Sequence, residues 1–343
     1  MAEKRQYNGL DVIKFILAIL VAFRHVVQIY YPVESKWRLL ICSWLSNLAV
    51  PGFFIMAGFF LFRKIENGRT DRDKKIVWGY CWRIFKLTLI WSAIYLPVDI
   101  YGWYYSDSDA SMLEWIWYYI KSFFLSHTIV QLWFLPALIV ACLLVWFLYS
   151  KKMKIWQILV AGGVLFGIYC FESNHYFGLQ LPGMAILQLY YKYFYTMRNG
   201  LFYGTFYVAL GLWFAKTEKR MSFRTAALGF VGCLALMFLE VIHYHNLNCV
   251  FMAAPAAFFM ISAAFAVKWK NRKLYPRLRG MSQWVYLSQY YFMFLFSLAT
   301  QPYLVSWTKK EITIAVMGPM ILFSAVMVWL SEKKGFGWLR KLI

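Results

Sequence analysis

Apolar stretches of about twenty residues recur along the whole chain, and they constrain its fold more than any other feature. About 20 apolar residues are enough for an α-helix to cross the hydrocarbon core of a bilayer. Such stretches lie approximately at 10–32, 37–62, 76–102, 130–150, 155–171, 200–215, 223–242, 249–267, 283–305 and 312–331. We therefore predict an all-α, polytopic transmembrane helix bundle of about ten spans. We predict that residues 1–343 form one transmembrane domain.

Composition supports a membrane protein over a soluble one. The chain is 62% hydrophobic and only 15% charged, whereas soluble domains carry roughly 25% charged residues. Its formal net charge of +21 could indicate a nucleic-acid partner. However, the basic residues lie in short loops between apolar stretches, which is how membrane topology is set. We therefore expect membrane lipid, and no nucleic acid, as the partner of this surface.

The basic loops also predict the orientation of the chain. Lys and Arg gather in alternate loops, at 63–75, 151–154, 216–224 and 268–279, and in the tail after residue 331. The loops between them hold fewer basic residues. Cytoplasmic loops carry the excess of Lys and Arg, so both termini are predicted to be cytoplasmic. The aromatic, amphipathic segment 112–125 is predicted to lie at the membrane interface rather than to span it.

The first apolar stretch contains three ionisable residues, Asp11, Lys14 and His25. A helix turns about 100° and rises about 1.5 Å per residue, so Lys14 and His25 lie within about 20° of one face and roughly 16 Å apart. Asp11 lies one turn before Lys14 and about 40° from the direction of His25. Ionisable groups at membrane depth are expensive unless they are paired or hydrated, and they usually mark a functional path. We interpret this face as a candidate site.

Each of these residues also has a purely structural interpretation. His25 can take a proton from an alcohol nucleophile near neutral pH, or it can be a packing histidine that is hydrogen-bonded between helices. Asp11 can hold Lys14 charged so that Lys14 orients a polar substrate or an anionic donor. Alternatively, the two form an ordinary ion pair at a helix end. The shared face of all three residues favours the functional interpretation.

Arg83 and Lys86 form a second basic pair, one turn apart in the third apolar stretch. At this depth they could receive phosphate groups that enter from the cytoplasm, or they could extend to the lipid headgroups. His127 and His175 are expected in external loops. Glu172 and His175 are too few to indicate a metal site, and we predict none. No nucleophile elbow, phosphate loop or dinucleotide fingerprint is present, which argues against a serine hydrolase or an ATP-driven pump.

Small residues at a spacing of four predict close helix packing at two places. These are Gly163 with Gly167, and Gly200 with Gly204. Such pairs let two helix backbones approach each other in a membrane.

Several blocks of the sequence resemble the acyltransferase type 3 family of integral membrane proteins. That family begins with Asp-x-x-Arg/Lys, ten residues and His, and Asp11, Lys14 and His25 have this spacing. The blocks VPGFFIMAGFFLF, QLWFLPALIV, FYGTFYVALGLWFA and GMSQWVYLSQYYFMF resemble later segments of the family. The chain departs from the family pattern at Lys14, where Arg is more usual, at Ala57 in place of Ser, and at Gln289 in place of His.

The resemblance implies an enzyme of the bacterial cytoplasmic membrane that transfers an acyl group, usually acetyl from acetyl-CoA, to a hydroxyl. The implied acceptor is a surface glycan or a lipid-linked sugar. His25 would act as general base or transient acyl carrier, with Asp11 and Lys14 organising the inner half of the cavity. Arg83 and Lys86 would contact the phosphates of acyl-CoA. Two alternatives remain open: a transporter of a small solute or acyl donor without catalysis, and a family member with only a structural role.

Overall fold

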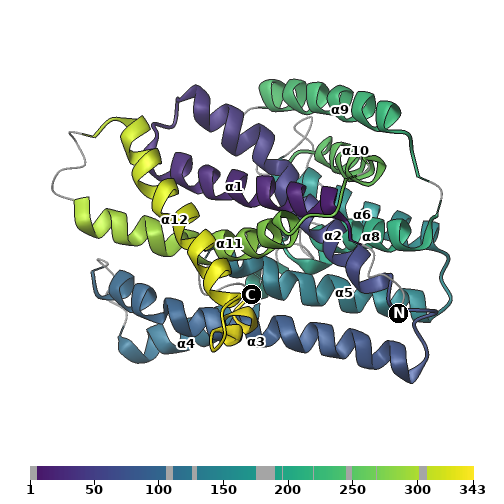
Figure 1. Cartoon of the computed structure of the whole chain (residues 1–343), viewed down its shortest axis with the longest axis horizontal. Helices are drawn as coiled ribbons and strands as arrows, with labels where there is room; N and C mark the ends of the chain where they lie inside the picture. Colours follow the sequence, from purple (N-terminus) through teal and green to yellow (C-terminus); the bar gives the residue numbers. More distant parts are fainter. Residues whose placement is uncertain are drawn as a thin grey trace. The chain divides into compact units, whose positions relative to one another are not determined.

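The computed structural model describes residues 6–105, 111–125, 130–174, 190–194, 196–218, 220–244, 249–267, 269–300 and 307–343. These residues form helices and connecting segments, and no strand occurs among them. Figure 1 shows the longer helices. They are α1 (Asn8–Tyr30), α2 (Ala49–Phe62), α3 (Asp71–Tyr104), α4 (Met112–Leu125), α5 (Phe134–Ser150), α6 (Ile155–Asn174), α8 (Thr205–Lys216), α9 (Phe223–Tyr244), α10 (Ala253–Ala266), α11 (Leu274–Thr300) and α12 (Lys309–Ser331). A π-helical segment and a 3-10 turn (Arg38–Trp44 and Leu45–Leu48) precede α2, and a second π-helical segment (Gly200–Gly204) precedes α8.

Seven helical segments in the described residues are long and apolar enough to cross a membrane. They coincide with seven of the predicted stretches: Asn8–Tyr30, Arg38–Phe62, Asp71–Tyr104, Gln131–Ser150, Ile155–Ser173, Phe223–Tyr244 and Lys309–Ser331. The other three predicted stretches are also helical but fall outside this group. Helix α8 has 12 residues and α10 has 14, while α11 is long enough but carries polar residues along its length, including Gln283 and Gln289. The fold is therefore an all-helical membrane protein, and the count of ten spans stays a prediction.

The chain divides into two compact units. The first unit comprises Met1–Phe53 and Lys219–Ile343, and the second comprises Phe54–Glu218. In the first unit, α1 packs along α11 and also contacts α10, α12 and the π-helical segment before α2. The close alignment of α1 and α11 is visible in Figure 1. Helix α1 is thus surrounded by elements from both ends of the sequence.

The core of the first unit is built where α1, α11 and α12 meet. Its buried members are apolar and mostly small or flexible, and they are spaced at helical intervals: Ala18, Ala22 and Val26 of α1, Val285 and Met293 of α11, and Val316, Met317 and Met320 of α12. Small side chains on α1 allow the larger residues of α11 and α12 to fill the space between the helices. This cluster fixes which face of α1 is turned inward.

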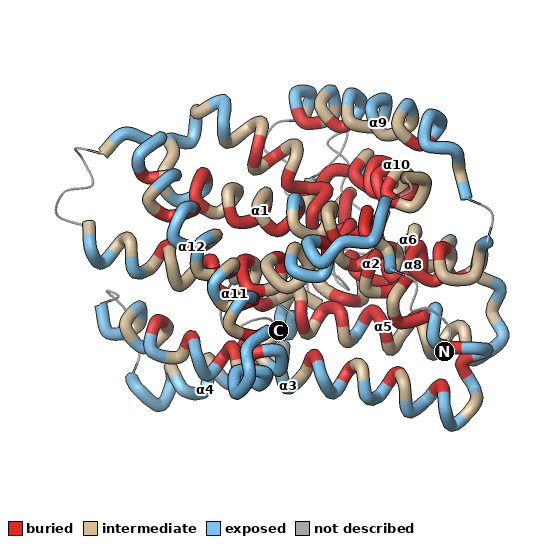
Figure 2. The backbone as a smooth tube through the Cα atoms, viewed as in Figure 1, coloured by how far each residue is buried: buried red, intermediate tan, exposed pale blue. Residues whose placement is uncertain are grey.

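Helix α9 illustrates the outer surface of the first unit. Most of its side chains are exposed or only partly buried, as Figure 2 shows. The exposed positions include Leu228, Val231, Leu236 and Leu239. A stripe of exposed aliphatic side chains would be unfavourable in water, but it matches the hydrocarbon of a bilayer. The carboxylate of Glu240 accepts hydrogen bonds from the backbone N–H groups of Phe251 (2.7 Å) and Met252 (2.9 Å), next to α10.

In the second unit, α5 contacts α3, α6, α8 and the π-helical segment before α8. Tyr203 lies in an aromatic cluster with Phe54, Trp133, Phe166, Tyr169 and Tyr207. The basic loop before α3 is held by Asp73, whose carboxylate accepts the backbone N–H groups of Glu66, Asn67 and Gly68 at 2.8–3.1 Å. These bonds satisfy backbone donors that would otherwise be left open at the turn.

The glycine predictions have different outcomes within this unit. A Cβ on Gly200 would lie 2.2 Å from the carbonyl oxygen of Ala137, and one on Gly204 would lie 2.9 Å from the Cβ of Ala141, so close packing is confirmed there. The prediction for Gly163 and Gly167 is wrong: a Cβ on Gly167 would meet nothing within 4 Å in the described structure. The close approach lies instead at Gly162, where a Cβ would be 2.9 Å from the Cα of Phe206. The cause is helix rotation, which glycine spacing alone does not define.

Candidate functional site

The N-terminal end of α1 carries a buried acidic group. Asp11 is 3% exposed, and its Oδ1 lies 3.5 Å from the Nε of Arg279, which belongs to α11. Lys14 follows Asp11 by one turn on the same helix and adds positive charge near this carboxylate. One turn earlier, the side chain of Asn8 donates a hydrogen bond of 2.9 Å to Asn271. The ion pair that the structure gives Asp11 is with Arg279 of α11, and the Asp11–Lys14 pair stays a prediction.

Arg279 is a residue whose role the sequence did not indicate. It was assigned to the basic loop 268–279, yet α11 begins at Leu274 and carries Arg279 in its second turn. The first turns of α11 carry polar residues, so they lie outside the apolar stretch from which the helix was predicted. Two such residues make ion pairs: Arg279 with Asp11, and Arg277 with Glu332 at 2.6 Å. The hydrogen bonds from Arg277 hold the pKa of the Glu332 carboxyl below its usual value.

Arg24 fixes the rotation of α1 near its other end. Its guanidinium donates hydrogen bonds to the backbone carbonyl of Cys42 (2.8 Å) and to the hydroxyl of Ser46 (2.9 Å). Both partners lie in the segment that leads into α2. Arg24 is therefore paired with this segment. Because α1 turns about 100° per residue, a fixed Arg24 also fixes the direction of His25.

His25 is partly buried and faces the side of α1 that builds the core. It follows Ala18 by seven residues, so the two side chains point within about 20° of each other. Ala18 is fully buried in the cluster of α1, α11 and α12. His25 is roughly 21 Å along the helix from Asp11. The structure thus places Asp11, Lys14 and His25 along one helix as predicted, with only the first two close together.

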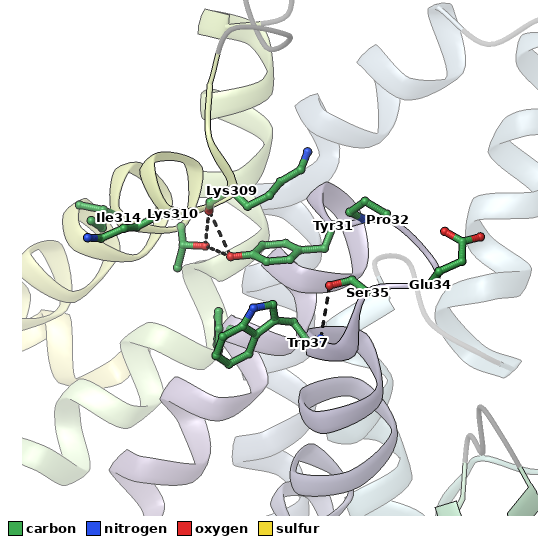
Figure 3. Close-up of a pocket in the computed structure, with 10 residues that line it drawn as sticks. Tyr31, Pro32, Glu34, Ser35, Trp37, Lys309, Lys310 and Ile314 are labelled. Carbon is green, nitrogen blue, oxygen red and sulfur yellow. Dashed lines mark hydrogen bonds between the residues drawn. The ribbon is translucent and has the colours of Figure 1, made fainter. Parts of the chain in front are cut away.

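A pocket of about 790 Å³ lies beyond the C-terminal end of α1. Its lining comes from α1, the segment that follows it and the start of α12: Phe23, Tyr31, Pro32, Glu34, Ser35, Trp37, Lys309, Lys310, Thr313 and Ile314. The hydroxyl of Tyr31 donates to the carbonyl of Lys309 (3.1 Å) and shares a hydrogen bond with Thr313 (2.8 Å), as Figure 3 shows. These bonds join the end of α1 to α12.

The chemistry of this pocket combines aromatic surface with positive charge. Trp37 is 44% exposed, so one of its faces is available to a ligand. Lys309 and Lys310 occupy the first turn of α12, where the helix dipole is also positive. Glu34 extends away from the Tyr31 and Trp37 rings (Figure 3). A sugar ring with a polar or anionic substituent is compatible with such a lining.

Arg83 and Lys86 lie on α3 in the second unit. Both side chains are exposed. The guanidinium of Arg83 lies 5.8 Å from the ring centre of Tyr80, and the ammonium of Lys86 lies 6.0 Å from that of Trp82. The pair therefore presents positive charge on the surface of α3, next to aromatic rings. This placement is compatible with contact to donor phosphates and equally with contact to lipid headgroups.

Two of the histidines considered in the sequence, His127 and His175, lie outside the described residues. Among the residues that are described, no group of three His, Cys, Asp or Glu side chains has the arrangement of a metal site. Polar side chains gather instead at the two ends of α1 and in the pocket beyond its C-terminal end.

Comparison with known proteins shows which family and which relatives the sequence matches. The sequence model of a family described as "Acyltransferase domain" matches residues 7–331, which is nearly the whole chain. A serine/alanine racemase of Enterococcus gallinarum is 23% identical over 292 residues, which are 82% of this chain and 40% of the relative. An amino-acid racemase of Enterococcus faecalis is 26% identical over 227 residues, 64% of this chain and 30% of the relative. The chain thus spans well under half the length of these curated relatives. No solved structure gives a significant match.

Proposed function

Because the chain belongs to the acyltransferase type 3 family, we propose that it transfers an acyl group from acyl-CoA to a hydroxyl of a glycan or lipid-linked sugar. Acetyl is the simplest such group, and the bacterial cytoplasmic membrane is the proposed location. The observation that carries the proposal is the polar face of α1. Asp11 is buried beside Arg279, and His25 faces the helical core. Placing polar groups here costs stability, which function can justify.

In this mechanism His25 is the general base. It removes the proton from the acceptor hydroxyl while the hydroxyl oxygen attacks the carbonyl carbon of the thioester. A carbon–oxygen ester bond forms, the carbon–sulfur bond breaks, and the proton passes from His25 to the departing CoA thiolate. The alternative, in which His25 carries the acyl group transiently, uses the same nitrogen as a nucleophile.

The two substrates would approach from opposite ends of α1. The predicted cytoplasmic loops are basic, which favours the phosphates of acyl-CoA at the Asp11 end. Lys14 would orient the donor there. In the second unit, Arg83 and Lys86 are separate candidates for contact with donor phosphates. The pocket beyond the other end of α1, with Trp37 and the Lys309–Lys310 pair, would admit the acceptor.

The direct test is label transfer from radioactive acetyl-CoA in membranes that contain the protein. We expect His25→Ala to lower the transfer rate about 10²- to 10⁴-fold, the usual contribution of a general base. His243→Ala is the matched control, since His243 is an exposed histidine on α9. Unchanged transfer by a folded His25→Ala protein would contradict the assignment of the base.

A second candidate function is transport of a small solute without chemistry. It is favoured by one observation: the relatives above are named for amino-acid racemisation, and this chain aligns with less than half of each. The shared part could therefore serve a purpose other than racemisation in those proteins. Uptake of labelled L-serine or L-alanine by vesicles that transfer no acetyl label would support transport. Acetyl transfer without uptake would support the acyltransferase.

A further inference from the structure

The inward face of α11 contains one strongly polar side chain. Val285, Gln289 and Met293 are spaced by four residues, so Gln289 lies midway between two members of the apolar core. Gln289 is 0% exposed. A carboxamide in this position replaces apolar packing with groups that need hydrogen bonds. Its presence in the core requires an explanation.

Of the two polar atoms of the Gln289 side chain, only the nitrogen makes a hydrogen bond within the described part of the chain. Its Nε2 donates to the backbone carbonyl of Tyr286 at 3.0 Å. A carbonyl can only accept, so this bond identifies which end of the amide is nitrogen and which is oxygen. The Oε1 is buried, and no donor in the described part of the chain reaches it. A buried acceptor without a donor is unfavourable, and such groups are rare in native proteins.

Gln289 lies at about the same level as His25. Helices α1 and α11 run in the same direction, since Asp11 meets Arg279 near their starts, and Tyr30 at the end of α1 meets the carbonyl of Met293 in the second half of α11. From Tyr30 back to His25 is roughly 7.5 Å along α1, and from Met293 back to Gln289 is roughly 6 Å along α11. His25 and Gln289 both lie on faces that contribute to the same core. Measured from the Asp11–Arg279 pair instead, the two levels differ by about 6 Å, so the open acceptor lies within roughly one helical turn of the level of the proposed base.

We infer that Gln289 is an acceptor-binding residue, whose Oε1 takes a hydrogen bond from the molecule that receives the acyl group. This inference rests on the acyl transfer proposed above. The hydroxyl that reacts gives its only proton to His25 and cannot donate that proton to Gln289 as well. The donor bound to Gln289 is therefore a second group on the same molecule. This requirement selects a polyhydroxylated acceptor, such as a sugar, over a simple alcohol.

The test compares two small acceptors, glycerol and 1-propanol, with labelled acetyl-CoA and the purified full-length protein in nanodiscs. The wild type should prefer glycerol, because glycerol carries additional donors. Gln289→Met keeps the length of the side chain and removes the acceptor oxygen. We expect it to lower kcat/KM for glycerol about tenfold, as the loss of one hydrogen bond does. Transfer to 1-propanol and to water should stay within about twofold of the wild type.

Two further variants separate binding from packing. Gln289→His should restore the preference for glycerol, since imidazole offers one donor and one acceptor, as the carboxamide does. Ser288→Ala is the matched control on the same helix, because the Ser288 hydroxyl donates within α11 to the carbonyl of Trp284 at 2.8 Å. It should leave the preference unchanged.

Thermal unfolding supplies a readout that does not depend on activity. A Gln289 that is kept for ligand binding leaves its acceptor open in the free protein. Gln289→Met should therefore unfold at the same temperature as the wild type or higher. A lower unfolding temperature with an unchanged preference for glycerol would overturn the inference in favour of a structural role. Absence of transfer to every acceptor by the wild type would refute the proposed function, and the inference with it.

Discussion

Asp11 is the residue whose neighbours matter most to the N-terminal end of α1. Its side chain is 4% exposed, whereas that of its partner Arg279 is 44% exposed. The carboxylate thus depends on a cation that remains partly in contact with solvent. Removing the cation from such a pair should cost more free energy of unfolding than breaking a surface pair, and less than breaking a fully buried one. Lys14 supplies additional positive charge on the same helix.

We predict that Arg279→Met lowers the free energy of unfolding by about 1–2 kcal/mol, because it leaves the Asp11 carboxylate buried with less compensation. Asp11→Asn in the same protein should recover most of that loss, since no charge then needs a partner. A double-mutant cycle in detergent, followed by thermal unfolding, measures the coupling. Arg277→Met, which breaks only the exposed pair with Glu332, is the control and should have a smaller effect. Additive effects of the Asp11 and Arg279 substitutions would contradict this account.

Sequence alone predicted part of this arrangement. Helix periodicity placed Asp11, Lys14 and His25 along one face, because the geometry of a single helix is fixed by its hydrogen bonds. The pairing with Arg279 could not be predicted, since it depends on how α1 packs along α11. The unpaired Oε1 of Gln289 could not be predicted for the same reason. In the sequence, Gln289 was only a departure from a family pattern.

At the scale of the helices, close backbone contact is the feature that most limits substitution. Helices α2 and α8 approach each other within the second unit at Gly58 and Gly211. A Cβ on Gly211 would lie 2.4 Å from the carbonyl oxygen of Ile55 and 2.6 Å from the backbone nitrogen of Phe59. These are backbone atoms, so they cannot move aside as the end of a flexible side chain can. The helices themselves would have to separate.

Gly211→Ala is therefore expected to destabilise the protein by about 1–3 kcal/mol, the usual range for an overpacked contact. Gly167→Ala is the matched control in α6, where an added Cβ meets no described atom within 4 Å. It should be neutral or stabilise by up to about 1 kcal/mol, since alanine favours the helix. Thermal unfolding in nanodiscs compares the two. Equal unfolding temperatures would show that the contact at Gly211 is loose.

The sequence identified these helices more reliably than it identified their contacts. Apolar stretches of sufficient length predicted the position of every long helix described above except α4, which was predicted as an amphipathic segment at the membrane interface. The ends were less accurate, as α11 shows, because polar turns extend a helix beyond its apolar part. Glycine spacing correctly indicated Gly200 and Gly204, but missed Gly58 and Gly211, which lie in different helices. Contacts between helices depend on their rotation, and periodicity within one helix does not define it.

For the whole molecule, the predicted orientation in the membrane can be tested with single cysteines and a thiol reagent that does not cross membranes. Lys64→Cys and Lys341→Cys lie at exposed positions on the predicted cytoplasmic side. They should react only after cells are permeabilised. Glu34→Cys, at the pocket beyond α1, should react in intact cells. Labelling is measured relative to the parent protein, which contains six cysteines. Reaction of Lys341→Cys in intact cells would contradict the predicted position of the C-terminus.

The division of the chain into two units has a consequence for how it is made. The first unit combines the first 53 residues with those after residue 218, and the second unit lies between them. During synthesis, Asp11 enters the membrane about 270 residues before Arg279, a delay of roughly 13–54 s at common translation rates. Throughout that interval the first helix holds an acidic group without its principal partner. A chain that ends before Arg279 therefore keeps this acidic group in the bilayer without the cation that compensates its burial.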